Sequence, residues 1–258
     1  MPTAYRIRMR VEALIISMRD QPAREAQVRA IRDACPVPST VLEAVDGRAL
    51  DGAQRARVFL PDRHRPAYPF PPRPGEIGCF LSHRAAWQAI IDRGLDAALI
   101  LEDDVELRRP RFDPAFARAC EAVRAHGLVR LPLMERAGAV ARARSVPMVS
   151  RPVVLPLGTQ AQVVSAGAAR RLLDASEPFD RPIDVFLQMR WVTGVPSCVV
   201  SPSGVHDATS RVGGSTIQAR GKPFVEVLSH EIRRPLYRAA IRALGVRAWI
   251  TGEPRGGA

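Results

Sequence analysis

One segment constrains the fold more than any other: a short apolar run that ends abruptly in three acids. Residues 97–101 read Ala-Ala-Leu-Ile-Leu, and Glu102, Asp103 and Asp104 follow directly. An uncharged run of this length is typical of a strand buried on both faces of a sheet. Acids at its carboxyl end would lie at the sheet edge where α/β proteins bind ligands. We therefore expect an α/β protein with its functional site at the end of this strand.

A second apolar run, at residues 13–17, is followed by a helix signal. Pro22 is a favourable first-turn residue, and Cys35-Pro36 marks the end of that helix. A strand followed by a helix supports alternating α/β layers. We predict further strands at residues 41–45, 128–133 and 153–157, helices at 75–91, 166–175 and 182–191, one or two basic helices at 225–250, and loops at 61–74 and 199–217.

The chain is strongly basic, with a net charge of +12 over 258 residues. A basic surface favours nucleic acid, anionic lipid headgroups or phosphorylated substrates, and charge alone does not choose among them. No apolar stretch has membrane-spanning length and no secretory-leader pattern is visible, so we expect a cytoplasmic protein. The cysteines are far apart, lack zinc-ligand spacing and are expected to be reduced thiols: Cys35, Cys79, Cys120 and Cys198.

The acidic segment has the ligand chemistry of a divalent cation site. Residues two apart on a strand point the same way, so Glu102 and Asp104 are expected to share a face. Their oxygens suit Mn²⁺ or Mg²⁺, with a diphosphate completing the shell. Three adjacent acids repel one another, and a bound cation would relieve that repulsion. A solvated turn or a helix cap is the alternative interpretation of such a strand end.

Several collinear segments carry a family resemblance. The most specific is Gly-Glu-Ile-Gly-Cys-Phe-Leu-Ser-His at residues 75–83, whose distance to residues 101–104 also matches. The others are residues 14–19 with Arg24, Glu-Ala-Val-Asp-Gly at 43–47, residues 158–165, Pro-Ile-Asp at 182–184, and Ser-Thr-Ile at 215–217. Together they resemble glycosyltransferase family 25, which includes lipooligosaccharide galactosyltransferases. One departure is Gln162, which stands where the family usually has an aromatic residue.

The resemblance implies a GT-A-like single domain with a mixed, mainly parallel central sheet flanked by helices. We expect this domain at residues 11–220 and a basic helical C-terminal tail at 221–258. The implied activity is a metal-assisted, inverting transfer of a sugar, galactose most typically, from a UDP-sugar. The implied acceptor is a saccharide hydroxyl of a bacterial lipopolysaccharide or lipooligosaccharide core. Related animal enzymes act on collagen hydroxylysine, and nothing in this sequence indicates that acceptor.

The resemblance also suggests roles for the acids. Asp104 is the first candidate metal ligand, and Glu102 joins the metal shell or touches the donor. His206, in the late loop, is expected to complete the shell, with a solvated imidazole as the alternative. Asp184 is the candidate general base that would deprotonate the acceptor hydroxyl, with a helix N-cap as the alternative.

Donor binding is expected around the ends of the first strands and the helix that precedes the acidic strand. Arg19 and Arg24 would pair with the diphosphate or orient the uracil, unless they are ordinary surface arginines. Ser82 and His83 are expected near the helix start, where donors meet phosphate oxygens; a buried histidine bonded to a carbonyl is the alternative. Gly78 is expected to allow close helix packing. The full expected set is Ser17, Arg19, Arg24, Asp46, Gly47, Ser82, His83, Glu102 and Asp103.

The tail interleaves arginines with apolar residues. That pattern suits a helix lying on anionic lipid at the inner face of the cytoplasmic membrane, and it equally suits a basic helix packed on the domain.

Two other functions compete with sugar transfer. The first is a basic nucleic-acid-binding protein, against which the 5% aromatic content and the absence of a recognised motif argue. The second is a degenerate family member that binds without turnover, which Gln162 favours and the retained acids oppose.

Overall fold

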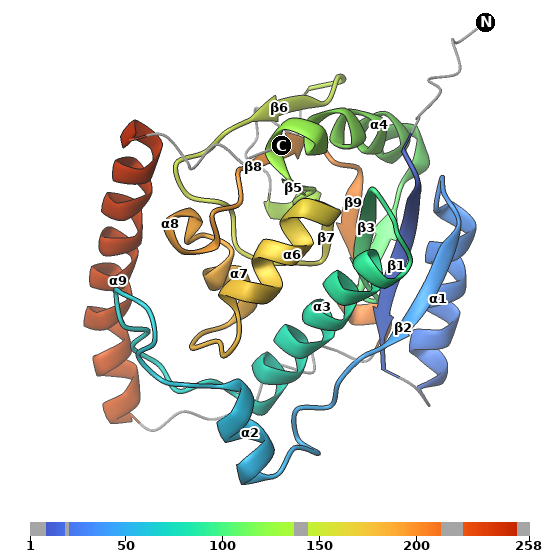
Figure 1. Ribbon diagram of the computed structural model, residues 1–258. Coiled ribbons are helices and arrows are strands. Elements are labelled where there is room, and N and C mark those ends of the chain that lie inside the picture. The colour runs from blue at the N-terminus through green and yellow to red at the C-terminus, as the bar shows by residue number, and fades with distance from the viewer. Residues whose placement is uncertain (1–8, 19–20, 137–143, 213–223, 252–258) are drawn as a thin grey trace, which may run out of the picture.

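The structure is a computed structural model that describes residues 9–18, 21–136, 144–212 and 224–251. A seven-stranded sheet, in the order β2-β1-β3-β7-β5-β8-β6, forms its centre (Figure 1). β2, β1, β3, β5 and β8 run in one direction, and β7 and β6 run in the other. The strands are β1 Val11–Ser17, β2 Ser39–Glu43, β3 Ala97–Glu102, β5 Leu128–Arg130, β6 Met148–Ser150, β7 Ala161–Ser165 and β8 Ser197–Ser201.

A small ribbon and two layers of helices complete the domain. The ribbon pairs β4 Val105–Leu107 with β9 Val205–Asp207 in antiparallel fashion. The helices are α1 Pro22–Ala34, α2 Gly52–Val58, α3 Pro74–Asp92, α4 Arg109–His126, α6 Ala166–Ala175, α7 Ile183–Phe186, α8 Arg190–Thr193 and α9 Phe224–Thr251, with 3-10 turns η1 Met134–Arg136 and η2 Thr209–Val212. α3, α6 and α7 cover one face of the sheet, and α1 and α4 cover the other. The expected mixed, mainly parallel sheet flanked by helices is confirmed.

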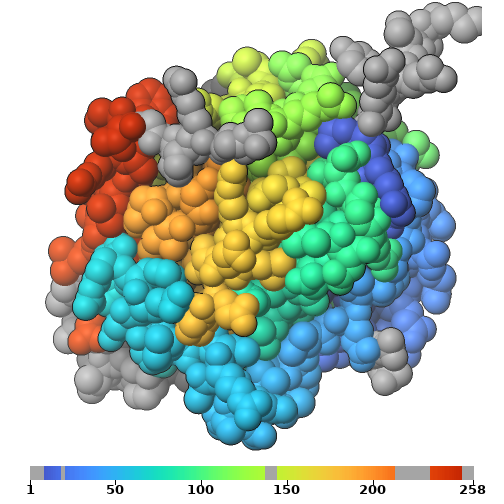
Figure 2. Space-filling model, viewed as in Figure 1, coloured from blue at the N-terminus to red at the C-terminus, as the bar shows by residue number. Residues whose placement is uncertain are grey.

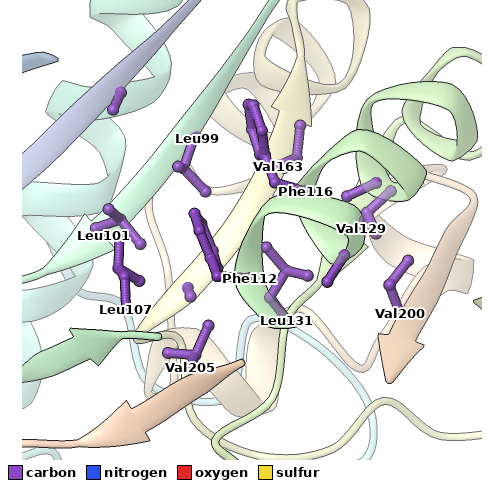
Figure 3. Close-up of a cluster of buried hydrophobic side chains, with 14 of the residues drawn as sticks. Leu99, Leu101, Leu107, Phe112, Phe116, Val129, Leu131, Val163, Val200 and Val205 are labelled. Carbon is purple, nitrogen blue, oxygen red and sulfur yellow. The ribbon is translucent and has the colours of Figure 1, made fainter. Parts of the chain in front are cut away.

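The central strands separate two apolar cores. Alternate residues of β3 point to opposite faces, so Leu99 and Leu101 join one core while Ala98 and Ile100 join the other. Leu99 and Leu101 pack with Phe112 of α4 in the core shown in Figure 3. Because β3 is fully buried on both faces, its sequence is a continuous apolar run rather than an alternating one.

Two glycines bring α3 against the turn that follows β2. A Cβ on Gly78 would lie 2.3 Å from the carbonyl oxygen of Val45, and one on Gly47 would lie 1.8 Å from that of Pro74. Neither position accepts a side chain without backbone movement. The structural role expected for Gly78 is confirmed, and Gly47 shares it.

A buried ion pair joins α9 to the rest of the domain. The side chains of Asp180 and Arg181 are both fully buried, 2.7 Å apart. Arg181 also donates to the Tyr237 hydroxyl of α9 at 2.6 Å and to the carbonyl oxygens of His64 and Pro66 in the predicted 61–74 loop. The tail is therefore a helix packed on the domain. None of the helices in the described ranges is long and apolar enough to cross a bilayer.

Some sequence predictions were wrong. Residues 153–157 form bends rather than a strand, because Pro152 and Pro156 each lack an N–H for a ladder. The predicted helix at 182–191 is split into α7 and α8. The predicted loop from 199 contains the end of β8, all of β9 and η2. Ser82 and His83 lie in the third turn of α3, not near its start, because Pro74 already occupies the first helical position.

Candidate active site

A pocket of about 220 Å³ lies at the carboxyl ends of β1 and β3, between the turn after β2 and one side of α3. Most of the residues predicted to bind donor or metal line it: Ser17, Arg24, Asp46, Gly47, Ser82, His83, Glu102, Asp103 and Asp104. Asp184 and His206 do not line this pocket. Arg19 lies outside the described residues. The pocket therefore gathers segments that are far apart in the sequence, from Ile16 to Asp104.

Asp103 holds two of its neighbours in place. Its Oδ2 accepts a 2.7 Å hydrogen bond from the Ser17 hydroxyl, and its Oδ1 forms a buried ion pair with Arg24 of α1. Burial raises the pKa of the Asp103 carboxyl, although Ser17 and Arg24 oppose that shift. Both oxygens thus bind protein groups, so Asp103 orders the pocket wall rather than presenting a free carboxylate.

Ser82 and Asp46 shape the turn opposite. The Ser82 hydroxyl accepts from the backbone N–H of Val45 and donates to the carbonyl of Gly78, both at 2.8 Å. Asp46 Oδ1 accepts from the backbone N–H of Arg48 at 2.9 Å, an Asx turn. The Ser82 proton is already committed within the protein, so this hydroxyl fixes the turn against α3.

Glu102 ends a chain of buried hydrogen bonds. Arg130 Nη1 donates to Gln162 Oε1 at 3.4 Å. Gln162 Nε2 lies 3.1 Å from His83 Nδ1. The other ring nitrogen, His83 Nε2, lies 3.2 Å from Glu102 Oε1. Arginine only donates, so the Gln162 oxygen must face Arg130 and its amide must donate to Nδ1. The proton of a neutral His83 is then on Nε2 and is donated to Glu102. Thr159 adds a 2.6 Å hydrogen bond to the same carboxylate oxygen.

The charge of Glu102 is consequently well compensated. Burial alone would raise its pKa, but the hydrogen bonds from His83 and Thr159 and the nearby charge of Arg130 hold the pKa below its ordinary value. Burial in turn lowers the pKa of Arg130 to about 10, despite the nearby charges of Asp184 and Glu102. Only Oε1 of Glu102 is occupied within the part of the chain that is described, and this leaves Oε2 for a ligand.

Asp104 has the opposite environment. Its Oδ1 is buried and lacks a hydrogen bond among the described residues, and its Oδ2 accepts only a 3.3 Å bond from Thr209. Burial, followed by the charges of Glu102, Asp103 and Asp207, raises the pKa of Asp104 to about 7. A divalent cation would stabilise a carboxylate in this environment, where one oxygen is buried without a hydrogen bond and like charges lie nearby.

A second group could also hold a metal. It consists of three ligand atoms that all lie within 4.8 Å of one another, one from each of Cys79, His83 and Glu102. Burial raises the pKa of the Cys79 thiol well above its ordinary value, so it would remain protonated. A thiol is a poor ligand for Mn²⁺ or Mg²⁺, which prefer oxygen. The oxygen donors around Asp104 fit these cations better.

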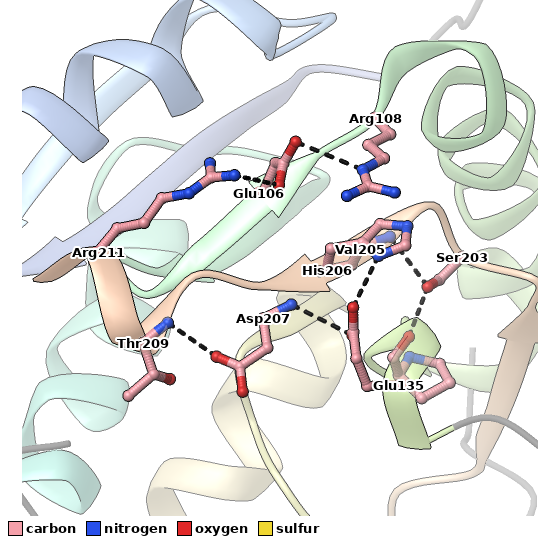
Figure 4. A network of polar contacts seen from close by, with 10 residues as sticks. Glu106, Arg108, Glu135, Ser203, Val205, His206, Asp207, Thr209 and Arg211 are labelled. Atoms are coloured by element: carbon pink, nitrogen blue, oxygen red, sulfur yellow. Dashed lines mark hydrogen bonds and ion pairs between the residues drawn. The ribbon is translucent and has the colours of Figure 1, made fainter. Parts of the chain in front are cut away.

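His206 is directed away from this site. It pairs in register with Glu106, and its Nδ1 lies 2.8 Å from Glu135 (Figure 4). The next residue, Asp207, pairs with Val105 and is the one whose charge raises the pKa of Asp104. Because successive strand residues face opposite sides, a site that takes Asp207 does not take His206. The sequence analysis selected His206, rather than its neighbour Asp207, from this segment.

Asp184 lies at the start of α7. Its Oδ2 accepts from the backbone N–H of Gly158 at 3.2 Å, and its Oδ1 accepts from that of Val185 at 2.8 Å. The N-cap position of α7 is Pro182, so Asp184 is not the cap. Its charge acts on Arg130 and Cys79, which places it in electrostatic contact with the Glu102 chain. Arg130 is a further site residue that sequence reasoning missed, because arginine is too abundant here for one to stand out.

Comparisons with known proteins identify the family of this chain. The model of glycosyltransferase family 25 (LPS biosynthesis protein) matches residues 11–187. Inactive glycosyltransferase 25 family member 3 of Mus musculus is 31% identical over 190 residues, covering 68% of this chain and 31% of the relative. Procollagen galactosyltransferase 1 of Danio rerio is 35% identical over 108 residues, covering 41% of this chain and 17% of the relative.

A solved structure is also similar, though distantly. The mannosyltransferase PcManGT from Pyrobaculum calidifontis, in complex with GDP-Man and Mn²⁺, is 14% identical with a TM-score of 0.40, covering 93% of this chain and 65% of that one. The chain spans about a third of the length of the mouse relative. Since the family model covers more than half of the chain, this protein belongs to glycosyltransferase family 25.

Proposed function

We propose that the protein is an active glycosyltransferase that moves a sugar, galactose by resemblance, from a UDP-sugar to a saccharide hydroxyl of a lipopolysaccharide or lipooligosaccharide core. The observation that carries the proposal is the buried Oδ1 of Asp104, which has no hydrogen-bond partner among the described residues and lies in a pocket at the carboxyl end of β3. A cation there would be held by Asp104 with Glu102 Oε2 and the nearby Asp207. Mn²⁺ or Mg²⁺ held there would neutralise charge on a diphosphate leaving group.

The remaining pocket groups would bind the nucleoside part of the donor. The turn at residues 46–48 is fixed by Ser82 and by the close approach of Gly47 to α3, so its backbone is preorganised before a ligand arrives. Ser17 and Arg24 are held by Asp103 at the opposite wall. A rigid cleft of this kind orients the donor without ordering new segments.

Asp184 is the proposed general base. Two backbone amides orient its carboxylate, and Arg130 lies within electrostatic reach of both Asp184 and Glu102. In an inverting displacement the acceptor hydroxyl attacks the anomeric carbon, the bond to the UDP oxygen breaks, and the hydroxyl proton passes to the base. The charge of Arg130 would help to keep Glu102 ionised beside this base.

A binding-only protein is the second candidate, because a relative named as inactive matches 68% of this chain. Gln162 is the residue that favoured a binding-only protein in the sequence analysis. Its position in the series of hydrogen bonds that ends at Glu102 weakens that argument. Instead of leaving a gap, Gln162 connects Arg130 to His83. The active reading is therefore favoured.

The test is release of UDP from UDP-galactose with Mn²⁺, first with water and then with core saccharides as acceptors. Asp184→Asn should retain UDP binding while turnover falls roughly 10²–10⁴-fold. Arg118→Met, at an exposed position of α4, is the control and should leave turnover unchanged. Tight UDP binding by the wild type without turnover on any sugar nucleotide would instead support the binding-only candidate.

A further inference from the structure

The outward side of α9 is an unpartnered surface with a defined pattern. The inward side packs on the domain through Tyr237, through the buried Ile241, and through Gly245, where a Cβ would lie 2.9 Å from the carbonyl oxygen of Val153. In Figure 1 the helix stands at one side of the molecule, and in Figure 2 its C-terminal part forms the rim. Its other side is therefore open to an external partner.

That open side is apolar along its centre. Leu236 is 65% exposed, Val246 38% and Ile250 73%. At 3.6 residues per turn these three side chains fall within an arc of about 80°. Trp249, 53% exposed, lies beside the arc. Large aliphatic groups on a helix surface with a tryptophan at the edge are typical of helices that lie in a membrane interface.

The flanks of the apolar stripe carry only positive charge. Residues 233–251 contain five arginines and no acid or lysine. All five are exposed, and none forms an ion pair with a carboxylate in the described ranges. Helical periodicity places Arg238 and Arg242 on one flank and Arg233 and Arg247 on the other. This arrangement complements a surface of dense negative charge with an apolar layer beneath it.

A groove continues the surface next to α9. It has a volume of about 470 Å³ and lies between α9 and residues 152–157. Val153, Val154 and Leu157 line it with Ile241, and Arg238 and Arg242 stand on its α9 side. An apolar groove beside two guanidinium groups suits the upper part of an anionic phospholipid.

We propose that the outward side of α9, together with this groove, docks the protein on a bilayer surface that contains anionic phospholipid. Arginines would bind the phosphates, and Leu236, Val246 and Ile250 would enter the interface. Nucleic acid would satisfy the arginines but offers no apolar layer for these three side chains. Docking does not depend on sugar transfer, so it stands or fails separately from the proposed function.

The test is co-sedimentation with vesicles of phosphatidylcholine containing about one third phosphatidylglycerol, against vesicles of phosphatidylcholine alone. Wild type should bind the anionic vesicles more tightly, and salt should weaken that binding. Arg238→Ala/Arg242→Ala should reduce the partition about 25-fold, since each arginine near an anionic surface contributes about fivefold. Arg29→Ala/Arg32→Ala on α1, at the opposite side of the molecule in Figure 1, should not.

A second measurement separates insertion from charge attraction alone. Trp249 fluorescence should shift to shorter wavelength on anionic vesicles, and Trp249→Phe should lose that shift. Leu236→Ser/Ile250→Ser should weaken binding with the arginines intact. The proposal is overturned by equal binding to neutral vesicles, by an equal loss in the α1 control, or by binding RNA as tightly as vesicles without a Trp249 shift.

Discussion

The two flanks of the acidic segment 102–104 compensate their charge in different ways. On one flank, Glu102 is bound by His83 and Thr159, and its pKa lies below the ordinary value. On the other, Asp104 has one weak partner, is surrounded by other acids and has a pKa raised to about 7. Two carboxylates only two positions apart therefore differ: protein groups compensate the charge of Glu102, whereas the charge of Asp104 is largely uncompensated. The comparison indicates a preformed scaffold around Glu102 and, at Asp104, a carboxylate whose charge the described residues leave largely uncompensated.

Stability should be most sensitive to mutation at the buried ion pair beside the acidic segment, between Arg24 and Asp103. Arg24→Met would leave the Asp103 carboxylate buried without its cation, and we expect a loss of about 3–5 kcal/mol in the free energy of unfolding. Urea denaturation measures it. Arg118→Met removes an exposed pair with Glu121 and should cost less than about 1 kcal/mol. Equal losses would mean that the buried pair does not support the pocket.

Gln162→Leu should break the chain that ends at Glu102. It removes the partner of His83 Nδ1 and leaves buried polar groups unsatisfied, so the expected loss is about 1–3 kcal/mol. Nitrogen NMR of the His83 ring should show a wild-type proton on Nε2 and a changed tautomer balance in the variant. Gln88→Leu, on the exposed side of α3, is the control for the same substitution. An unchanged His83 spectrum would contradict the directed chain.

Unlike the two variants above, Asp104→Asn should increase the free energy of unfolding. Because the pKa of Asp104 is raised to about 7, the folded protein binds its proton more tightly than the unfolded chain, so metal-free stability falls as pH rises from about 4 to about 7 and is level above that. The variant should therefore be more stable than wild type by roughly 1–2 kcal/mol at pH 8, and this difference should shrink below about pH 7 and vanish near pH 4. Thermal unfolding in chelator across this range is the measurement. Asp207→Asn should reduce the same pH dependence in part; a pH-independent difference would refute the explanation.

His206→Ala should have the smallest effect. Glu135 is half exposed, so the pair is expected to contribute less than about 1 kcal/mol. Mn²⁺-dependent UDP binding should be unchanged in the variant and reduced in Asp207→Asn. A loss of about tenfold or more in the Mn²⁺-dependent affinity for UDP in His206→Ala would indicate that His206 does contribute to the metal site.

Local sequence signals predicted the parts of the fold that depend on local pattern. The apolar runs at 13–17 and 97–101 became β1 and β3, and the acids at 102–104 line one pocket. Gly78 could be assigned to packing from its position in α3. Strand and helix alternation predicted α/β layers, and β1 does pair in parallel with β2 and β3.

The remaining features depend on contacts distant in sequence. β9 has only three residues and exists through its pairing with β4, about 100 positions earlier, so the facing of His206 and Asp207 could not be predicted. Gln162 is 79 positions from His83, and only the register of β3, β7 and β5 brings it between His83 and Arg130. The i, i+2 argument for Glu102 and Asp104 failed in detail, because β3 ends at Glu102 and the chain turns there.

The most direct test of the proposed cation site at Asp104 is calorimetric binding of UDP with and without Mn²⁺, on wild type and on Asp104→Ala. The account predicts metal-dependent UDP binding by wild type and its loss in Asp104→Ala, with the fold of the variant intact by circular dichroism. UDP binding that is the same with and without Mn²⁺, or that survives in Asp104→Ala, would contradict it.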